Sequence, residues 1–81
     1  MNKQIVSVDE LIAILNEELS KFDECEGCRY TNSVTRLRET DPNGCNWSSV
    51  TLQCSGVSSK PCKPISLEII YKAKQKYNLS D

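Results

Sequence analysis

The chain has 81 residues, and its ten basic and eleven acidic side chains give a formal net charge of −1. This length fits one domain, residues 1–81, that buries only about 60% of its unfolded surface. The near-neutral charge argues against a nucleic-acid partner, and the absence of any run of about 18 apolar residues argues against a membrane-spanning segment. We therefore expect a small domain that needs some support beyond its modest core.

The first predicted element is a helix that begins after Ser7. Ser7 and Glu10 have the spacing of a capping box, in which each side chain accepts a hydrogen bond from the other residue's amide. Val6 and Leu11 occupy the two positions of a hydrophobic staple. Apolar residues then recur at helical spacing until Asp23 and form a stripe that should face the core: Val8, Leu11, Ile12, Leu15, Leu19 and Phe22.

A hairpin is predicted around Pro42-Asn43-Gly44, because proline, asparagine and glycine favour a tight turn. Pairing Asp41 with Cys45 places Val34 opposite Leu52, Arg36 opposite Val50 and Asn32 opposite Cys54. The strands then have two different faces. The inner face carries Tyr30, Val34, Val50, Leu52 and Cys54, and the outer face carries Ser33, Thr35, Leu37, Trp47, Ser49, Thr51 and Gln53.

A second helix is predicted from about Lys63, with Pro64 in its first turn and a stop near Asn78. Its apolar stripe comprises Ile65, Ile69, Ile70, Ala73 and Tyr77. The fold class is therefore α+β, a helix–β-hairpin–helix (α-β-β-α) chain with both helices packed on one face of a small antiparallel sheet. Residues 5–6 could add a short edge strand.

Five cysteines in so short a chain indicate either a disulfide framework or a metal site. The N-terminus lacks an apolar run of signal-peptide length, and five is an odd number, so we expect a cytoplasmic protein with reduced thiols. Strand length separates Cys45, at the turn, from the other cysteines. Cys25, Cys28, Cys54 and Cys62 could then hold one structural zinc ion. The alternative is that these thiols are buried without any metal.

Thiol redox chemistry at Cys25 and Cys28 is a second alternative. Redox cysteines usually precede a helix, where its dipole and nearby cations lower the thiol pKa. The Cys25-Glu26-Gly27-Cys28 segment instead follows a helix and lies beside Asp23 and Glu24. These features disfavour the thiolate.

Lys60 and Lys63 precede the second helix and could bind an anion there, because two cations at a helix N-terminus oppose the helix dipole. The order helix, strands, helix with lysines at this position resembles a double-stranded-RNA-binding domain. The resemblance implies phosphate contacts from Lys60 and Lys63. Pro61 and Pro64 interrupt that entrance, and the net charge has the wrong sign, so weak nucleic-acid or anion binding is a third alternative.

Leu37 and Trp47 lie close together on the predicted outer face of the hairpin, where they could form a surface for a protein partner or a homodimer. The chain has no histidine, phosphate loop or dinucleotide fingerprint. We therefore expect a non-catalytic intracellular interaction module stabilised by a cysteine cluster that could hold structural zinc.

Overall fold

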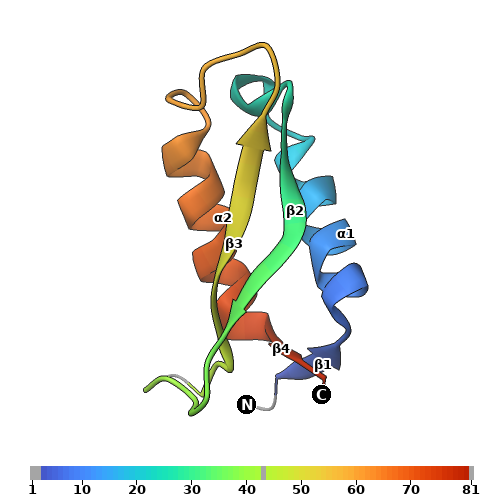
Figure 1. The fold of residues 1–81 in the computed structure, drawn as a ribbon, viewed down its shortest axis with the longest axis vertical. Helices are drawn as coiled ribbons and strands as arrows, with labels where there is room; N and C mark the ends of the chain where they lie inside the picture. Colours follow the sequence, from blue (N-terminus) through green and yellow to red (C-terminus); the bar gives the residue numbers. More distant parts are fainter. Residues whose placement is uncertain (1–2, 43, 81) are drawn as a thin grey trace.

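The computed structural model describes residues 3–42 and 44–80, whose helices and strands are arranged as Figure 1 shows. In chain order the elements are β1 (Gln4–Val6), α1 (Val8–Leu19), the 3-10 turn η1 (Asp23–Cys25), β2 (Cys28–Arg36), β3 (Trp47–Cys54), α2 (Lys63–Lys76) and β4 (Tyr77–Leu79). Strands β2 and β3 form the predicted antiparallel hairpin, and β1 and β4 form a separate parallel pair. The protein is thus a small mixed α and β structure with two helices and a hairpin among its described residues.

Helix α1 begins where the capping box predicts. The Glu10 amide donates to Ser7 Oγ and the Ser7 amide donates to Glu10 Oε1, each over 3.1 Å. The helix ends at Leu19, one turn earlier than the apolar spacing suggested, and Phe22 adopts an extended conformation before η1. The helix buries Leu11, Ile12, Leu15 and Leu19.

Replacing Ser7 with alanine should lower the free energy of unfolding by about 1 kcal/mol, because it removes the acceptor for the Glu10 amide. Chemical denaturation of Ser7→Ala measures this loss. Ser33→Ala, on the exposed side of β2, is the control and should change stability by less than about 0.5 kcal/mol. Equal stability of the two variants would show that the capping box contributes nothing.

The hairpin turn has the predicted contacts, but away from the turn the pairing of β2 with β3 differs from the predicted register. The Asp41 amide donates to the Cys45 carbonyl over 2.9 Å, and the Gly44 amide donates to the Asp41 carbonyl over 2.8 Å. Val34 nevertheless pairs with Val50 rather than Leu52, and Cys28 pairs with Cys54. Because the shift is by an even number of residues there, the predicted faces survive. Val50 is buried, whereas Thr35, Thr51 and Gln53 are exposed.

The predicted position of Trp47 on the outer face is wrong. Thr35 pairs with Ser49 and Arg36 pairs with Trp47, so Ser48 is an extra residue on β3. A bulge of one residue reverses the faces that side chains on its two sides occupy, so Trp47, before the bulge, lies on the opposite face from the one predicted. The Trp47 side chain is therefore turned into the core and is fully buried, and its Nε1 donates to the Tyr77 carbonyl over 3.1 Å.

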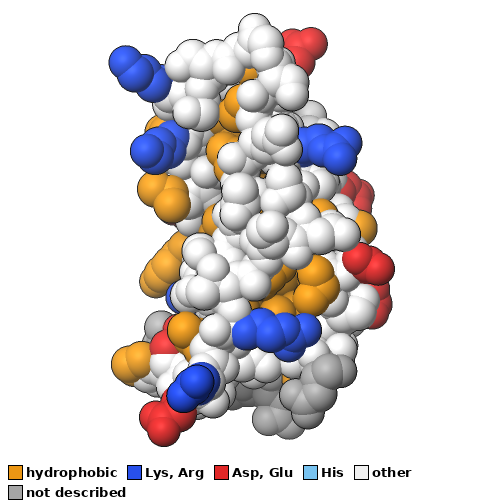
Figure 2. All heavy atoms as spheres, viewed as in Figure 1, with side chains coloured by type: hydrophobic (Ala, Val, Ile, Leu, Met, Phe, Trp, Pro, Cys, Tyr) orange, Lys and Arg blue, Asp and Glu red, His pale blue; other side chains and the backbone are white. Residues whose placement is uncertain are grey.

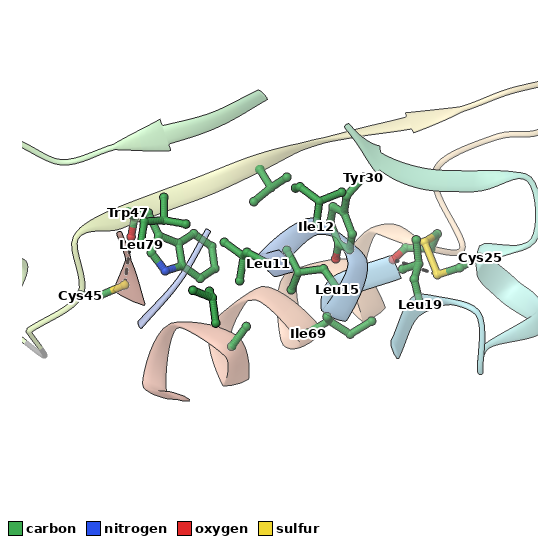
Figure 3. Packing of buried hydrophobic residues seen from close by; sticks show 14 residues of the cluster. Leu11, Ile12, Leu15, Leu19, Cys25, Tyr30, Cys45, Trp47, Ile69 and Leu79 are labelled. Atoms are coloured by element: carbon green, nitrogen blue, oxygen red, sulfur yellow. Dashed lines mark hydrogen bonds between the residues drawn. A yellow bond between two sulfur atoms is a disulfide. The ribbon is translucent and has the colours of Figure 1, made fainter. Parts of the chain in front are cut away.

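The core lies between the hairpin strands and the helices (Figure 3). Tyr30 extends from β2 to α2, where its hydroxyl donates to the Ser66 carbonyl over 2.8 Å. Burial raises the pKa of Tyr30 to about 12, so the phenol stays a neutral donor. The buried apolar residues are Val6, Leu11, Ile12, Leu15, Leu19, Cys25, Tyr30, Cys45, Trp47, Val50, Cys62, Ile69, Ala73 and Leu79.

The residues expected to form an extra edge strand do form β1, but β1 pairs with β4 rather than with the hairpin. Val6 lies beside Leu79 in this parallel pair. Two asparagines join the pair to the hairpin turn. Asn46 exchanges two hydrogen bonds of 2.8 Å with the backbone of Leu79, and Asn78 Nδ2 donates to the Gly44 carbonyl over 3.0 Å. The two termini of the fold therefore meet at the turn end of the hairpin (Figure 1).

Helix α2 begins at Lys63 with Pro64 in its first turn, as predicted, but ends at Lys76, so β4 includes Asn78, the predicted stop. Its first amides receive no side-chain cap from Cys62. The amides of Cys62 and Lys63 donate instead to the Ser59 carbonyl, over 3.1 and 2.9 Å.

Candidate functional site

Four of the five cysteines form two disulfides at the end of the molecule where η1, the strand ends and the start of α2 meet. Cys25 is bonded to Cys62, and Cys28 is bonded to Cys54. The first bridge is buried, and the second is partly exposed. The fifth cysteine, Cys45, is a buried thiol beside Trp47, far from the other four along the core (Figure 3).

The disulfides contradict the predicted zinc site. Zinc binds thiolates, and a sulfur in a disulfide carries no thiolate. Cys25, Cys28, Cys54 and Cys62 are the predicted ligands, and all four are bonded in pairs. Across residues 3–42 and 44–80, no group of three or more histidine, cysteine, aspartate or glutamate side chains could hold a metal ion. The reasoning from strand length placed these four cysteines at one end of the molecule, where the two disulfides lie. Sulfur atoms that lie close together can form disulfides as well as bind a metal.

The predicted cytoplasmic location is also wrong. Disulfides form and persist in oxidising compartments, whereas cytosolic reductants keep most thiols reduced. Two bridges in one small domain indicate an extracellular or otherwise oxidising environment. The odd number of cysteines was misleading because Cys45 is shielded from such pairing by its burial.

The two cysteines of the redox alternative belong to different bridges. Cys25 and Cys28 each bond to a distant partner rather than to one another. Both bridges therefore tie separate elements together. This arrangement gives no support to a Cys25–Cys28 dithiol site.

The other predicted site residues lie apart. Leu37 is half-buried and follows β2, whereas Trp47 is fully buried, so the two do not form an exposed apolar surface. Lys60 and Lys63 are exposed at the entrance of α2, as expected. Their binding of an anion stays a prediction. No helix in the described part of the chain is long and apolar enough to cross a membrane.

The structure instead contains an apolar groove between α1 and α2 that the sequence did not reveal. The groove has a volume of about 490 Å³, within the range of ligand-binding sites. Its buried floor comes from Leu15, Ile69 and Ala73. Ile14 and Phe22 line it from the α1 side, and further lining residues are Glu18, Pro64, Ile65, Glu68, Lys72, Lys76 and Tyr77.

The charged residues of the groove are separated by sign along its length. Glu18 and Glu68 lie toward the disulfide end, because α1 ends and α2 begins there. Lys72 and Lys76 lie toward the end formed by β1 and β4. Glu68 and Lys72 form an ion pair of 3.8 Å between side chains that are mostly exposed, so this pair contributes little stability. Glu18 also forms an ion pair of 3.3 Å with Lys21. The acidic lining residues therefore lie nearer the disulfide end and the basic ones nearer the β1–β4 end, and each glutamate has a lysine beside it.

One signal in the sequence could have indicated this groove. Ile14 lies outside the predicted α1 stripe, yet it is apolar and half-buried on the edge of the helix. An extra apolar residue beside a core stripe widens the apolar face beyond what the core uses.

We found no matching protein-family model, curated protein or solved structure.

Proposed function

We propose that the protein is a non-catalytic, disulfide-stabilised binding domain of an oxidising compartment, and that its α1–α2 groove receives an amphipathic helix from a partner protein. The observation that carries the proposal is the apolar groove between the two helices, with its glutamates nearer one end and its lysines nearer the other. The arrangement assumed is a two-layer one, in which both helices share one face of the hairpin. The opposite side of the helix pair then remains open to a partner.

The groove dimensions favour a helix of about three turns. The lining residues on α2 extend from Pro64 to Lys76. At about 1.5 Å of rise per residue, this distance is about 18 Å. An amphipathic helix of that length presents one apolar face to such a groove and keeps its polar face in solvent. The groove is partly open to solvent, which also suits a polypeptide segment.

The charges predict the direction of the bound helix. A helix is stabilised by acidic residues in its first turn and basic residues in its last turn. An acidic N-terminal turn would lie near Lys72 and Lys76, and a basic C-terminal turn would lie near Glu18 and Glu68. The partner helix would therefore run parallel to α1 and antiparallel to α2.

Two synthetic peptides of about 14 residues test this proposal by NMR titration. Both have the same leucine-rich apolar face; one is acidic at its N-terminal turn and basic at its C-terminal turn, and the other has these charges exchanged. The first peptide should shift the Ile14 and Ile65 resonances and bind at least about tenfold more tightly than the second, a difference of about 1.4 kcal/mol. The Ile14→Glu variant should lose this binding, because it places a charge in the apolar lining.

Ala13→Glu is the matched control, since Ala13 is exposed on α1 and does not line the groove. This variant should retain the affinity of the unmodified protein. Binding of neither peptide, or equal binding of both, would contradict the helix proposal. Binding of a free fatty acid such as laurate, with no binding of peptide, would assign the groove to a small apolar ligand instead.

A further inference from the structure

The two edges of the β2–β3 hairpin are different. The outer edge of β2 is occupied at Tyr30 by the side chain of Asn16 from α1. The Tyr30 amide donates to Asn16 Oδ1 over 2.8 Å, and Asn16 Nδ2 donates to the Tyr30 carbonyl over 3.2 Å. The asparagine amide thus takes the place that a neighbouring strand would occupy, and it protects this edge from pairing with another chain.

The same contact shows which backbone groups of β3 face outward. Tyr30 pairs with Leu52, yet the Tyr30 amide and carbonyl bond to Asn16, away from β3. This is therefore a non-hydrogen-bonded pair, in which the Leu52 amide and carbonyl also point away from the partner strand. The amide and carbonyl of Val50, two residues earlier on β3, point the same way. Within the described parts of the chain, β3 pairs with β2 alone, so its outer edge has no strand partner.

Beyond the bulge at Ser48, the part of β3 formed by residues 49–54 lacks the charges and prolines that usually prevent an edge from pairing. The sequence of the whole strand, Trp-Ser-Ser-Val-Thr-Leu-Gln-Cys, has neither a charged residue nor a proline. When a strand pairs with its own copy across a two-fold axis, identical residues approach one another near that axis. A charged strand would then place like charges opposite each other, which destabilises the pair. β3 imposes no such cost, so it is suited to pairing with itself.

Helix α2 adds an apolar surface on the flank that does not face the groove. Leu67 and Tyr71 are each 60% exposed and lie four residues apart, so they share one side of the helix. Helical spacing places them about a third of a turn or more from Ile65 and Ile69, which line the groove. Figure 2 shows apolar side chains projecting from the α2 flank at the left of the molecule, beside the hairpin.

We infer that the protein forms a homodimer through its β3 edges. Two β3 strands pair antiparallel across a two-fold axis and create a four-stranded sheet in the order β2-β3-β3-β2. Val50 of each strand pairs with Leu52 of the other, so the axis passes beside Thr51. Leu67 and Tyr71 of one α2 then contact the same residues of the other α2 beneath this sheet. The groove between α1 and α2 remains open in each subunit, so the dimer does not depend on the proposed helix partner.

Sedimentation velocity of the disulfide-bonded protein tests this inference. The unmodified chain should sediment with twice the mass of the monomer, and dilution should dissociate it. Thr51→Lys should raise the dissociation constant at least about tenfold, because it places two like charges near the two-fold axis. Thr35→Lys is the matched control. Thr35 is exposed on the same outer face but lies on β2, away from the axis, so this variant should dimerise normally.

The helix contact has its own pair of variants. Tyr71→Glu should weaken the dimer at least about tenfold, whereas Gln75→Glu, one turn further along the exposed side of α2, should have little effect. Hydrogen exchange gives an independent readout. The Leu52 and Val50 amides should become more protected as protein concentration rises. A monomer at every concentration, or a dimer that tolerates both Thr51→Lys and Tyr71→Glu, would overturn the inference.

Discussion

Removing the Cys25–Cys62 disulfide should lower the free energy of unfolding by about 2–5 kcal/mol, the usual cost in a small domain. The bridge joins residues 37 positions apart, and chain entropy alone predicts about 3.8 kcal/mol for a loop of this length. Both half-cystines are also buried in the core. Cys62 lies directly before the first residue of α2, so the bridge ties the start of this helix to η1. A Cys25→Ala/Cys62→Ala double variant, unfolded by denaturant, measures the loss without creating new free thiols.

The second bridge provides the comparison. Cys28 and Cys54 are only 26 positions apart, so this bridge constrains a shorter loop of the unfolded chain, and both residues are partly exposed. The Cys28→Ala/Cys54→Ala variant should therefore lose less stability than the first double variant. A larger loss in this second variant would show that the hairpin ends, and not the start of α2, depend most on a covalent link.

Replacing Trp47 with alanine should cost about 3–5 kcal/mol, because it leaves a large cavity at one end of the core. The side chain is fully buried, and its Nε1 supplies a donor to the Tyr77 carbonyl. Trp47→Phe keeps much of the volume but removes that donor, so it should cost less, about 1–3 kcal/mol.

Leu37→Ala tests the burial of Trp47 by comparison with a less buried residue. Leu37 is only half-buried, so its truncation should destabilise the protein less than Trp47→Ala. Thermal unfolding of the three variants gives the order. If Trp47→Ala were the mildest of them, Trp47 would lie on the surface and the bulge at Ser48 would be absent.

The helices and the hairpin were predictable because local chemistry specifies them. Ser7 and Glu10 mark the start of α1 through contacts three residues apart, and Pro64 marks the first turn of α2. The alternation of side chains also predicted the buried face of β3 around Val50, since an even shift in pairing keeps the faces unchanged.

The features that the sequence did not predict depend on long-range contacts or on a single residue. One extra residue, Ser48, reverses the face of Trp47, and nothing in a run of two serines indicates a bulge. The β1–β4 pair joins Val6 to Leu79 through strands of three residues, which are too short to carry a periodic signal. The predicted cysteine cluster was compatible with zinc and with disulfides, because both need only that the sulfur atoms meet.

The candidate groove was missed for a related reason. Helical periodicity identifies residues that face a core, but it does not show how two helices are spaced in the folded chain. Leu15 and Ile69 were both predicted as core residues and are buried. Only the packing of α1 against α2 turns their solvent side into the floor of a groove.

The parallel pairing of β1 with β4 determines how the domain would respond to tension along its backbone. If the chain is pulled through its two ends, β1 and β4 slide in opposite directions, so their hydrogen bonds are loaded together in shear rather than broken one by one. Once they yield, the Cys25–Cys62 bond stops further extension between those residues. Only the segments before 25 and after 62 can lengthen, to about 3.5 Å per residue, while the hairpin between them carries no load. The domain would therefore resist extension at first and then lengthen only to a maximum that the disulfide sets.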